Sequence, residues 1–241
     1  MNRIKRALRS FVFKYLISPV VNVDNSHAQA GEDRILNYLF SSMGIKNISY
    51  IDIGANHPVN GNNTYWFNKN GSRGVLIEPD HSLFEQLQQI RPTDLVLNVG
   101  VSDAENGEAD FFVFDHSALN TFSEADATQR LSSGAYKIID KRSIKLLTIA
   151  SIINEHMGGN IPHLISLDVE GLDLRILNAF DFEKYPVPVW VIETCEYSEN
   201  HIKPKVTQII DLMIAKGYFV FGDTYINTIF VKKAWFEAMG N

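Results

Sequence analysis

Cysteine is almost absent from the chain, since Cys195 is the one such residue among 241. An intrachain disulfide is therefore excluded, and so is a metal site built from several cysteines. Long apolar runs are also missing, because no segment approaches the roughly 20 residues that a membrane-spanning helix needs. Positive charge is in deficit, with 22 Lys and Arg against 28 Asp and Glu. The resulting net charge of −6 does not suit a nucleic-acid binder, and we expect no such partner.

The N-terminal segment differs from the rest in joining basic side chains to apolar ones. Its apolar stretch is interrupted by Lys14 and soon meets Pro19, which does not suit a signal peptide. We expect residues 1–25 to form a basic amphipathic helix and a linker, and residues 26–241 to form one domain. Residues 1–20 would lie on the inner surface of an anionic membrane, or pack on this domain or on a partner. The basic residues are Arg3, Lys5, Arg6 and Arg9.

The single cysteine suits a reducing compartment, so we expect a cytoplasmic protein. Association into a homo-oligomer is compatible with the sequence, which does not specify it.

Downstream of the N-terminal segment, short apolar runs alternate with stretches of helical periodicity. Continuous apolar runs are typical of parallel strands that are buried on both faces. The last two runs are separated only by the polar turn at 222–225, which predicts an antiparallel hairpin. We therefore predict an α/β fold with a doubly wound, seven-stranded, mostly parallel sheet that ends in a hairpin. The apolar runs are 48–53, 74–77, 95–99, 111–114, 164–167, 187–192, 218–221 and 226–231, and the helical stretches include 35–40, 82–90, 172–180 and 206–216.

The segment 115–144 contains few strand signals. It is too long to be a plain loop in a compact domain. We expect it to pack as a lid or to carry a short helix.

The first apolar run ends in a motif that contains Asp52, Gly54 and Asn56. In an open parallel sheet, ligands bind at the carboxyl ends of the strands. A glycine there lets a ligand approach the backbone, and Asp52 is placed to reach a positively charged amino group. The dinucleotide fingerprint G-x-G-x-x-G is absent, because Asn56 and Val59 stand where its later glycines belong. A tight turn at Gly54 with no ligand is the alternative for this motif by itself.

The second apolar run is followed by Glu78. A carboxylate at the end of the second strand of such a sheet is placed to accept both ribose hydroxyls of a nucleoside cofactor. A lone glutamate at a strand end is more often simply solvated. Because it accompanies the first motif, we interpret Glu78 as a ribose-binding residue.

The fifth and sixth apolar runs both lead into acidic residues, Asp168 with Glu170 after the fifth and Glu193 after the sixth. A negatively charged carboxylate at the end of a buried strand costs free energy unless a cation or a proton compensates its charge. We interpret Asp168 as a general base, a metal ligand or a cofactor contact, with Glu193 in the same cleft. Both would suit Mg²⁺, which binds oxygen ligands. Capping of the next helix is the alternative, chiefly for Glu170. His57, just past the first motif, is the third catalytic candidate.

At these residues the sequence resembles the FkbM-type methyltransferase family, over roughly residues 26–232. Several blocks in the same order make the resemblance more specific than any one motif. It implies a class I methyltransferase with a Rossmann-like fold, S-adenosylmethionine as the cofactor and, commonly, O-methylation of hydroxyls on sugars or secondary metabolites. The blocks that carry it are 29–36, 51–58, 63–65, 74–79, 120–123 and 167–171.

The resemblance also implies roles for individual residues. Asp52, Gly54 and Asn56 would lie at the methionine part of the cofactor, and Glu78 would bind its ribose. An N-terminal segment would fold over the cofactor through Gln29, Glu32 and Asp33. The acceptor would be a small molecule or a glycan, whose identity the resemblance does not give.

Two other classes fit part of the pattern. A nicotinamide-dependent oxidoreductase would use a similar sheet, but the missing glycines and the terminal hairpin count against it. A non-catalytic cofactor-binding scaffold would keep Glu78, but it would not need acidic strand ends at Asp168 and Glu193.

Overall fold

The computed structural model describes residues 26–104, 107–116, 119–132, 134–169, 171–195 and 204–239. The expected basic helix and linker of residues 1–25 lie outside these ranges, as does Glu170. Within the ranges, no helix is long and apolar enough to cross a membrane.

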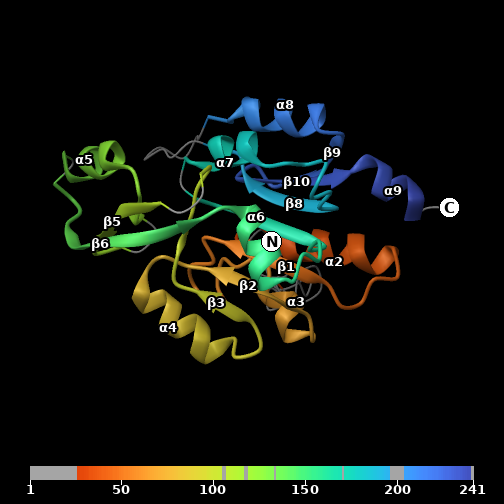
Figure 1. Ribbon diagram of the computed structural model, residues 1–241, viewed down its shortest axis with the longest axis horizontal. Coiled ribbons are helices and arrows are strands. Elements are labelled where there is room, and N and C mark those ends of the chain that lie inside the picture. Colours follow the sequence, from red (N-terminus) through yellow and green to blue (C-terminus); the bar gives the residue numbers. More distant parts are fainter. Residues whose placement is uncertain are drawn as a thin grey trace, which may run out of the picture.

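A seven-stranded sheet forms the centre of the molecule (Figure 1). Its strands are β1 (Ser49–Ile53), β2 (Arg73–Ile77), β3 (Leu95–Leu97), β7 (Leu164–Leu167), β8 (Val189–Glu193), β9 (Tyr218–Asp223) and β10 (Asn227–Lys232). Their spatial order is β3-β2-β1-β7-β8-β10-β9. Neighbours are parallel except at β10, which is antiparallel to both β8 and β9. The predicted mostly parallel sheet with a terminal hairpin is confirmed.

The inner strands are apolar along their length because both of their faces are covered. All residues of β7 are buried, and so is most of β1 and β8. The parallel register places Ile53 of β1 beside both Ile77 of β2 and Leu167 of β7. The residues that follow these three positions therefore emerge side by side at one edge of the sheet, and this register positions the candidate site.

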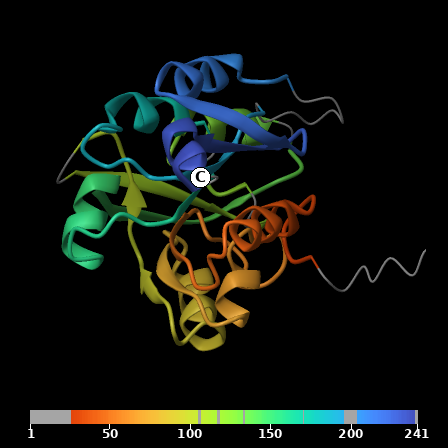
Figure 2. The same cartoon turned by 90° about the vertical axis from the view of Figure 1, so that its right-hand side faces the viewer.

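Helices cover both faces of the sheet, as a doubly wound fold requires. They are α2 (Glu32–Ser42), α3 (Tyr65–Lys69), α4 (His81–Ile90), α6 (Ile149–His156), α7 (Asp173–Ala179), α8 (Thr207–Ala215) and α9 (Lys233–Met239). One apolar cluster joins one face to α6, α7 and α8, with Ile153, Ile176 and Met213 at its centre. A second cluster joins the other face to α2, α3 and α4 through residues such as Leu39 and Phe67. In both views α8 and α4 lie at opposite ends of the molecule (Figure 1 and Figure 2).

A smaller sheet projects from this core. Its order is β4-β6-β5, built from β4 (Gly100–Val101), β5 (Glu108–Phe114) and β6 (Ile138–Leu147). Helix α5 (Glu124–Ser132) lies between β5 and β6 in the chain. In Figure 1 this unit extends to the left, away from α9. We call residues 108–147 the arm.

The segment 115–144 carries helix α5, which agrees with the expectation of a lid or a short helix. Strand β6 also begins within it, at Ile138, although the segment has few strand signals. Its middle carries Asp140, Lys141 and Arg142, because the ribbon that it forms with β5 is exposed to solvent there. A ribbon with a solvated face has no continuous apolar run, and so the signal used to recognise buried strands is absent.

Candidate active site

Two adjoining cavities open at the carboxyl ends of β1, β2 and β7. The first, which we call the inner cavity, has an empty volume of about 630 Å³ and is lined by residues that include Glu78, Leu83, Val101, Phe111, Asn120 and Phe122. The second, which we call the polar cleft, has about 1160 Å³ and is lined by residues that include Gln29, Asp52, Asn63, His116, Tyr136 and Glu193. Gly54, Asn56 and Asp168 line both. The two cavities therefore meet at these three residues and form one continuous site.

Glu78 lines the inner cavity with its carboxylate held by two backbone amides. Asn56 N donates to Oε2 and Asp80 N donates to Oε1, each at 2.8 Å. A carboxylate oxygen accepts two hydrogen bonds, so each oxygen retains capacity for a ligand hydroxyl. Burial raises the pKa of Glu78 to about 7, although the two backbone hydrogen bonds act to lower it. This geometry fits the predicted role of a ribose-binding carboxylate.

Gly54 leaves β1 in the left-handed conformation, with φ 76°. A Cβ at this position would lie 2.0 Å from the carbonyl oxygen of Asp168, so the loop after β7 leaves room only for glycine. The close approach expected at Gly54 is therefore made by the protein's own backbone. Asn56 is also left-handed, with φ 48°, and its N–H points to Glu78. The turn thus brings three strand ends into contact.

Asp52 is buried next to the polar cleft, and much of its hydrogen-bonding capacity is used inside the protein. Its Oδ2 accepts hydrogen bonds from Thr64 Oγ1 at 2.7 Å and from Asn62 Nδ2 at 3.1 Å. Burial raises the pKa of Asp52, while the Arg91 guanidinium and these hydrogen bonds act to lower it. Both lone pairs of Oδ2 are thus occupied, and a side-chain hydrogen bond from Ser166 also engages the carboxylate. The contact of Asp52 with an amino group stays a prediction. The first task of Asp52 is to hold the loop between β1 and α3.

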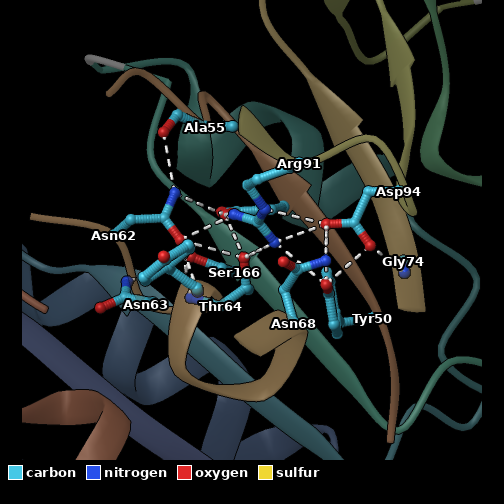
Figure 3. Close-up of polar contacts among 12 residues, drawn as sticks. Tyr50, Ala55, Asn62, Asn63, Thr64, Asn68, Gly74, Arg91, Asp94 and Ser166 are labelled. Carbon is cyan, nitrogen blue, oxygen red and sulfur yellow. Dashed lines mark hydrogen bonds and ion pairs between the residues drawn. The ribbon is translucent and has the colours of Figure 1, made fainter. Parts of the chain in front are cut away.

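A fully buried arginine, Arg91, compensates the charges in this region (Figure 3). Its Nη2 lies 2.7 Å from Asp94 Oδ2, and its Nη1 lies 4.0 Å from Asp52 Oδ2. Nη1 also donates to Asn62 Oδ1 at 3.0 Å, and Nη2 donates to Thr64 Oγ1 at 2.9 Å. The side chains that orient Asp52 are therefore themselves oriented by Arg91.

Asp94 completes this network (Figure 3). It accepts hydrogen bonds from the Tyr50 hydroxyl at 2.8 and 2.9 Å, from Asn68 Nδ2 at 3.0 Å and from Gly74 N at 2.9 Å. Burial raises the pKa of Tyr50, so its hydroxyl remains a proton donor. The network ties the end of α4 to β1, α3 and β2. Through Arg91 it also holds Asn62, which lines the polar cleft.

Asp168 follows β7 directly and is exposed at the junction of the two cavities. Its N–H donates to Ile53 O at 3.1 Å, which continues the β1–β7 ladder. The turn after it is held by the buried Asp173, whose carboxylate accepts from Val169 N and Gly171 N at 3.2 Å each. Burial, and secondly the charge of Asp168, raise the pKa of Asp173 to about 7. Asp173 thus supports the loop, and Asp168 lines both cavities.

Glu193 ends β8 and lines the polar cleft together with Asp168, as expected from their shared sheet edge. Among the residues described, no group of three or more His, Cys, Asp or Glu side chains is placed to hold a metal ion. Asp168 and Glu193 would supply two oxygen ligands to Mg²⁺, and this role stays a prediction.

Of the three N-terminal residues implied to cover the cofactor, Gln29 lines the polar cleft. Glu32 and Asp33 are fully buried and line neither cavity. Glu32 accepts from Asn227 Nδ2 at 3.0 Å and so ties α2 to the β9–β10 hairpin, and Asp33 accepts from His27 N at 2.7 Å. Their place in the structure is to hold the segment that carries Gln29.

The catalytic candidate His57 is not brought into the site. Its Nδ1 accepts hydrogen bonds from Val59 N at 3.1 Å and Asn60 N at 2.9 Å, and it lines neither cavity. The ring stabilises a turn in the loop after β1.

Several lining residues were not identified as candidates from the sequence. Asn63 and Asn120 lie within blocks of the family resemblance, which is the one signal that marks them. His116 and Tyr136 lie on the arm and belong to no recognisable motif. Their position depends on the pairing of β5 with β6, which was not predicted.

The sheet order and the antiparallel β10 between β8 and β9 define a class I methyltransferase fold. The Methyltransferase FkbM domain matches residues 52–220, and the chain belongs to this family. No curated protein matches the chain in sequence.

The chain is similar in fold to solved methyltransferase structures. A TehB-like SAM-dependent methyltransferase from Corynebacterium glutamicum is 12% identical, with 95% of this chain and 97% of that chain covered and a TM-score of 0.44. An O-methyltransferase from Bacillus cereus in complex with SAH is 15% identical, with 94% and 97% covered and a TM-score of 0.40.

Arg91→Ala is expected to lower the free energy of unfolding by about 3–5 kcal/mol, because it leaves buried carboxylates without their cation. Urea denaturation followed by circular dichroism measures this loss. Arg73→Ala is the control, since Arg73 is exposed and a surface substitution changes stability by about 0.5 kcal/mol or less. Equal effects of the two substitutions would contradict the role of Arg91.

Gly54→Ala is expected to destabilise the protein more than Gly44→Ala does. Both glycines are left-handed, with φ 76° and 72°, so each alanine costs about 1–2 kcal/mol of backbone strain. A Cβ at Gly44 meets nothing within 4 Å, whereas at Gly54 it meets the backbone of Asp168. Thermal unfolding of the two variants isolates the cost of this contact, and equal melting temperatures would rule it out.

Proposed function

We propose that this chain is an S-adenosylmethionine-dependent O-methyltransferase that acts on a hydroxyl of a sugar, a glycan or a secondary metabolite. The observation that carries the proposal is the junction at Asp168. There a cavity that contains a buried carboxylate opens into a wide polar cleft. Membership of a methyltransferase family supports the same chemistry.

The residues present fit the cofactor. Glu78 has two carboxylate oxygens that can each accept a ribose hydroxyl, and apolar side chains such as Leu83, Val101 and Phe122 line the same cavity and suit a flat base. In the polar cleft, Asn63 Nδ2 donates to Ser166 Oγ at 3.1 Å, and its buried Oδ1 has no protein partner. An unpaired buried acceptor of this kind suits the cofactor's ammonium group or an acceptor hydroxyl. When bound, S-adenosylmethionine supplies a methyl group on a positively charged sulfur.

The protein's contribution to the reaction is alignment of the acceptor, exclusion of water and removal of a proton. Asp168 stands where the two cavities meet, so its carboxylate is placed to accept the proton of an acceptor hydroxyl. Glu193 lines the same cleft and is a second carboxylate there. A Mg²⁺ ion held by this pair would acidify the hydroxyl instead, and loss of activity with EDTA distinguishes this scheme from direct proton transfer.

The lining of the polar cleft supports a polyhydroxylated acceptor. Amide side chains both donate and accept hydrogen bonds, which matches sugar hydroxyls. The amide and ring side chains in the lining are Gln29, Asn56, Asn60, Asn63, His116 and Tyr136, together with Asn62, whose amide is hydrogen-bonded inside the protein. The net charge of −6 fits a small molecule or a glycan better than nucleic acid.

Placement in the cytoplasm and self-association are further parts of the proposal. Contact with the inner membrane surface through residues 1–20 is another, which rests on the sequence because these residues lie outside the described ranges.

Calorimetric titration with S-adenosylhomocysteine, beside NAD and NADP, tests the function. Micromolar binding of S-adenosylhomocysteine alone is the expected result. Binding of a nicotinamide cofactor instead would favour the oxidoreductase. Binding of S-adenosylhomocysteine without methyl transfer to a broad panel of hydroxylated sugars and glycans would favour a cofactor-binding scaffold.

Asp168→Asn is expected to reduce methyl transfer by at least about a hundredfold, because an amide cannot take the proton of the acceptor. Its affinity for S-adenosylhomocysteine is expected to change little, since Glu78 remains. Transfer of a radiolabelled methyl group and calorimetry measure the two quantities. Asp211→Asn, on the exposed side of α8, is the control. Turnover that survives in Asp168→Asn would remove Asp168 from the mechanism.

Affinity for S-adenosylhomocysteine is expected to fall about tenfold between about pH 8 and pH 6. The pKa of Glu78 is raised to about 7, so its carboxylate becomes protonated across this window and accepts ribose hydroxyls less well. Glu78→Gln should bind weakly at every pH. Asp173→Asn should keep the pH dependence, although Asp173 also has a pKa of about 7. A flat profile for the unmodified protein would contradict the role of Glu78.

A further inference from the structure

The arm forms a wall of both cavities. Phe111, Asn120 and Phe122 face the inner cavity, whereas Leu119 and Tyr136 line the polar cleft. Leu119 and Asn120 are adjacent in the chain, yet Leu119 lines the polar cleft and Asn120 lines the inner cavity. A shift of the arm therefore changes both cavities at once.

A buried hydrogen bond ties the arm to the loop after β2. Asn120 Nδ2 donates to Asp80 Oδ2 at 2.8 Å, and both residues are at most 9% exposed. Asn120 Oδ1 accepts from Phe114 N at 2.8 Å, so the amide is fixed on its arm side as well. A hydrogen bond to a carboxylate is about twice as strong as one between neutral groups, and burial shields it from water.

Asp80 connects this bond to the carboxylate assigned to ribose. Its Oδ1 accepts from Ser82 N at 2.8 Å and Leu83 N at 3.3 Å, which caps α4. Its own N–H donates to Glu78 Oε1 at 2.8 Å. A continuous chain of hydrogen bonds thus leads from Glu78 through Asp80 and Asn120 to β5 of the arm.

We propose that Asn120 is a positioning residue that latches the arm onto the ribose-binding loop. The latch completes the inner cavity and, through the adjacent Leu119, sets the shape of the polar cleft. This inference rests on the proposed function for its ligands. It goes beyond that function in making occupancy of the inner cavity organise the acceptor site.

The latch is tested by exchanging its two partners. Asn120→Asp places two carboxylates opposite each other. The double variant Asp80→Asn with Asn120→Asp restores one donor and one acceptor in the reverse direction. The new amide keeps an oxygen for the α4 cap, and the new carboxylate still accepts from Phe114 N. Asn160→Asp, which adds the same charge at an exposed site away from the cavities, is the control.

Two measurements distinguish the effect of the latch on the arm from its effect on ligand binding. Hydrogen–deuterium exchange of peptides covering 111–122, without ligand, is expected to be faster in Asn120→Asp and normal in the double variant and the control. Calorimetry is expected to give at least tenfold weaker binding of S-adenosylhomocysteine in Asn120→Asp, with recovery to within about threefold in the double variant. In the unmodified protein, S-adenosylhomocysteine is expected to slow exchange at residues 119–122 and also around Tyr136.

The outcomes assign failure to one proposal or the other. Unchanged exchange and affinity in Asn120→Asp overturn the latch. Impaired values that the double variant does not restore overturn it too, because Asn120 would then act only through general packing. If the unmodified protein binds no S-adenosylhomocysteine, the proposed function fails, and the coupling of the two cavities fails with it. Exchange without ligand still decides whether Asn120 holds the arm.

Discussion

The positive charge of Arg91 is the constraint on which the rest of the site depends. A fully buried guanidinium is tolerated only when its donors are satisfied and its charge is matched. Here Asp94 supplies the close counter-charge, and Asn62, Thr64 and Tyr50 accept the remaining donors. Because these partners come from β1 and the following loop, the arginine fixes the floor of the polar cleft before any ligand arrives. The lining of the polar cleft is thus supported by an internal ion pair whose two members, Arg91 and Asp94, line neither the inner cavity nor the polar cleft.

The carboxylates of Asp52, Glu78 and Asp168 occupy three different environments at the sheet edge. Asp52 is surrounded by hydroxyl and amide donors near a cation, so its charge is compensated by groups within the protein. Glu78 is held by two backbone amides and retains capacity for further donors. Asp168 is exposed in the cavities. Of the three, Asp168 is the exposed one, whereas Asp52 and Glu78 are buried.

The central sheet could be predicted because buried parallel strands leave a plain record in the sequence. The runs before Asp52, Glu78 and Asp168 are apolar on both faces, and the register of parallel strands then brings their ends together. The arm could not be predicted in this way, since β6 has a solvated face and polar residues in its middle. Short helices such as α3 and α9 were likewise missed, because too few turns are present to establish a periodicity.

Residues that line the candidate site carry a sequence signal where they follow a strand end, and carry none where their position depends on distant contacts. Glu78 and Asp168 are marked by their positions in the chain. His57 has an equally suggestive position, but its ring is used by the backbone of its own turn. Arg91 and Asp94 carry no motif, and their importance comes from burial. Asn120 contacts Asp80 from the arm, whose β5–β6 pairing could not be predicted from the sequence.

The place of β10 in the sheet has a consequence for how the chain folds during synthesis. β10 pairs with β8 on one side and β9 on the other, so β8 has no neighbour there until residue 232 has been made. Up to that point, the nascent domain presents the open edge of an apolar central strand, the kind of edge that recruits other chains. Once the hairpin is complete, β8 is paired on both sides, and β9 forms the edge of the sheet in its place.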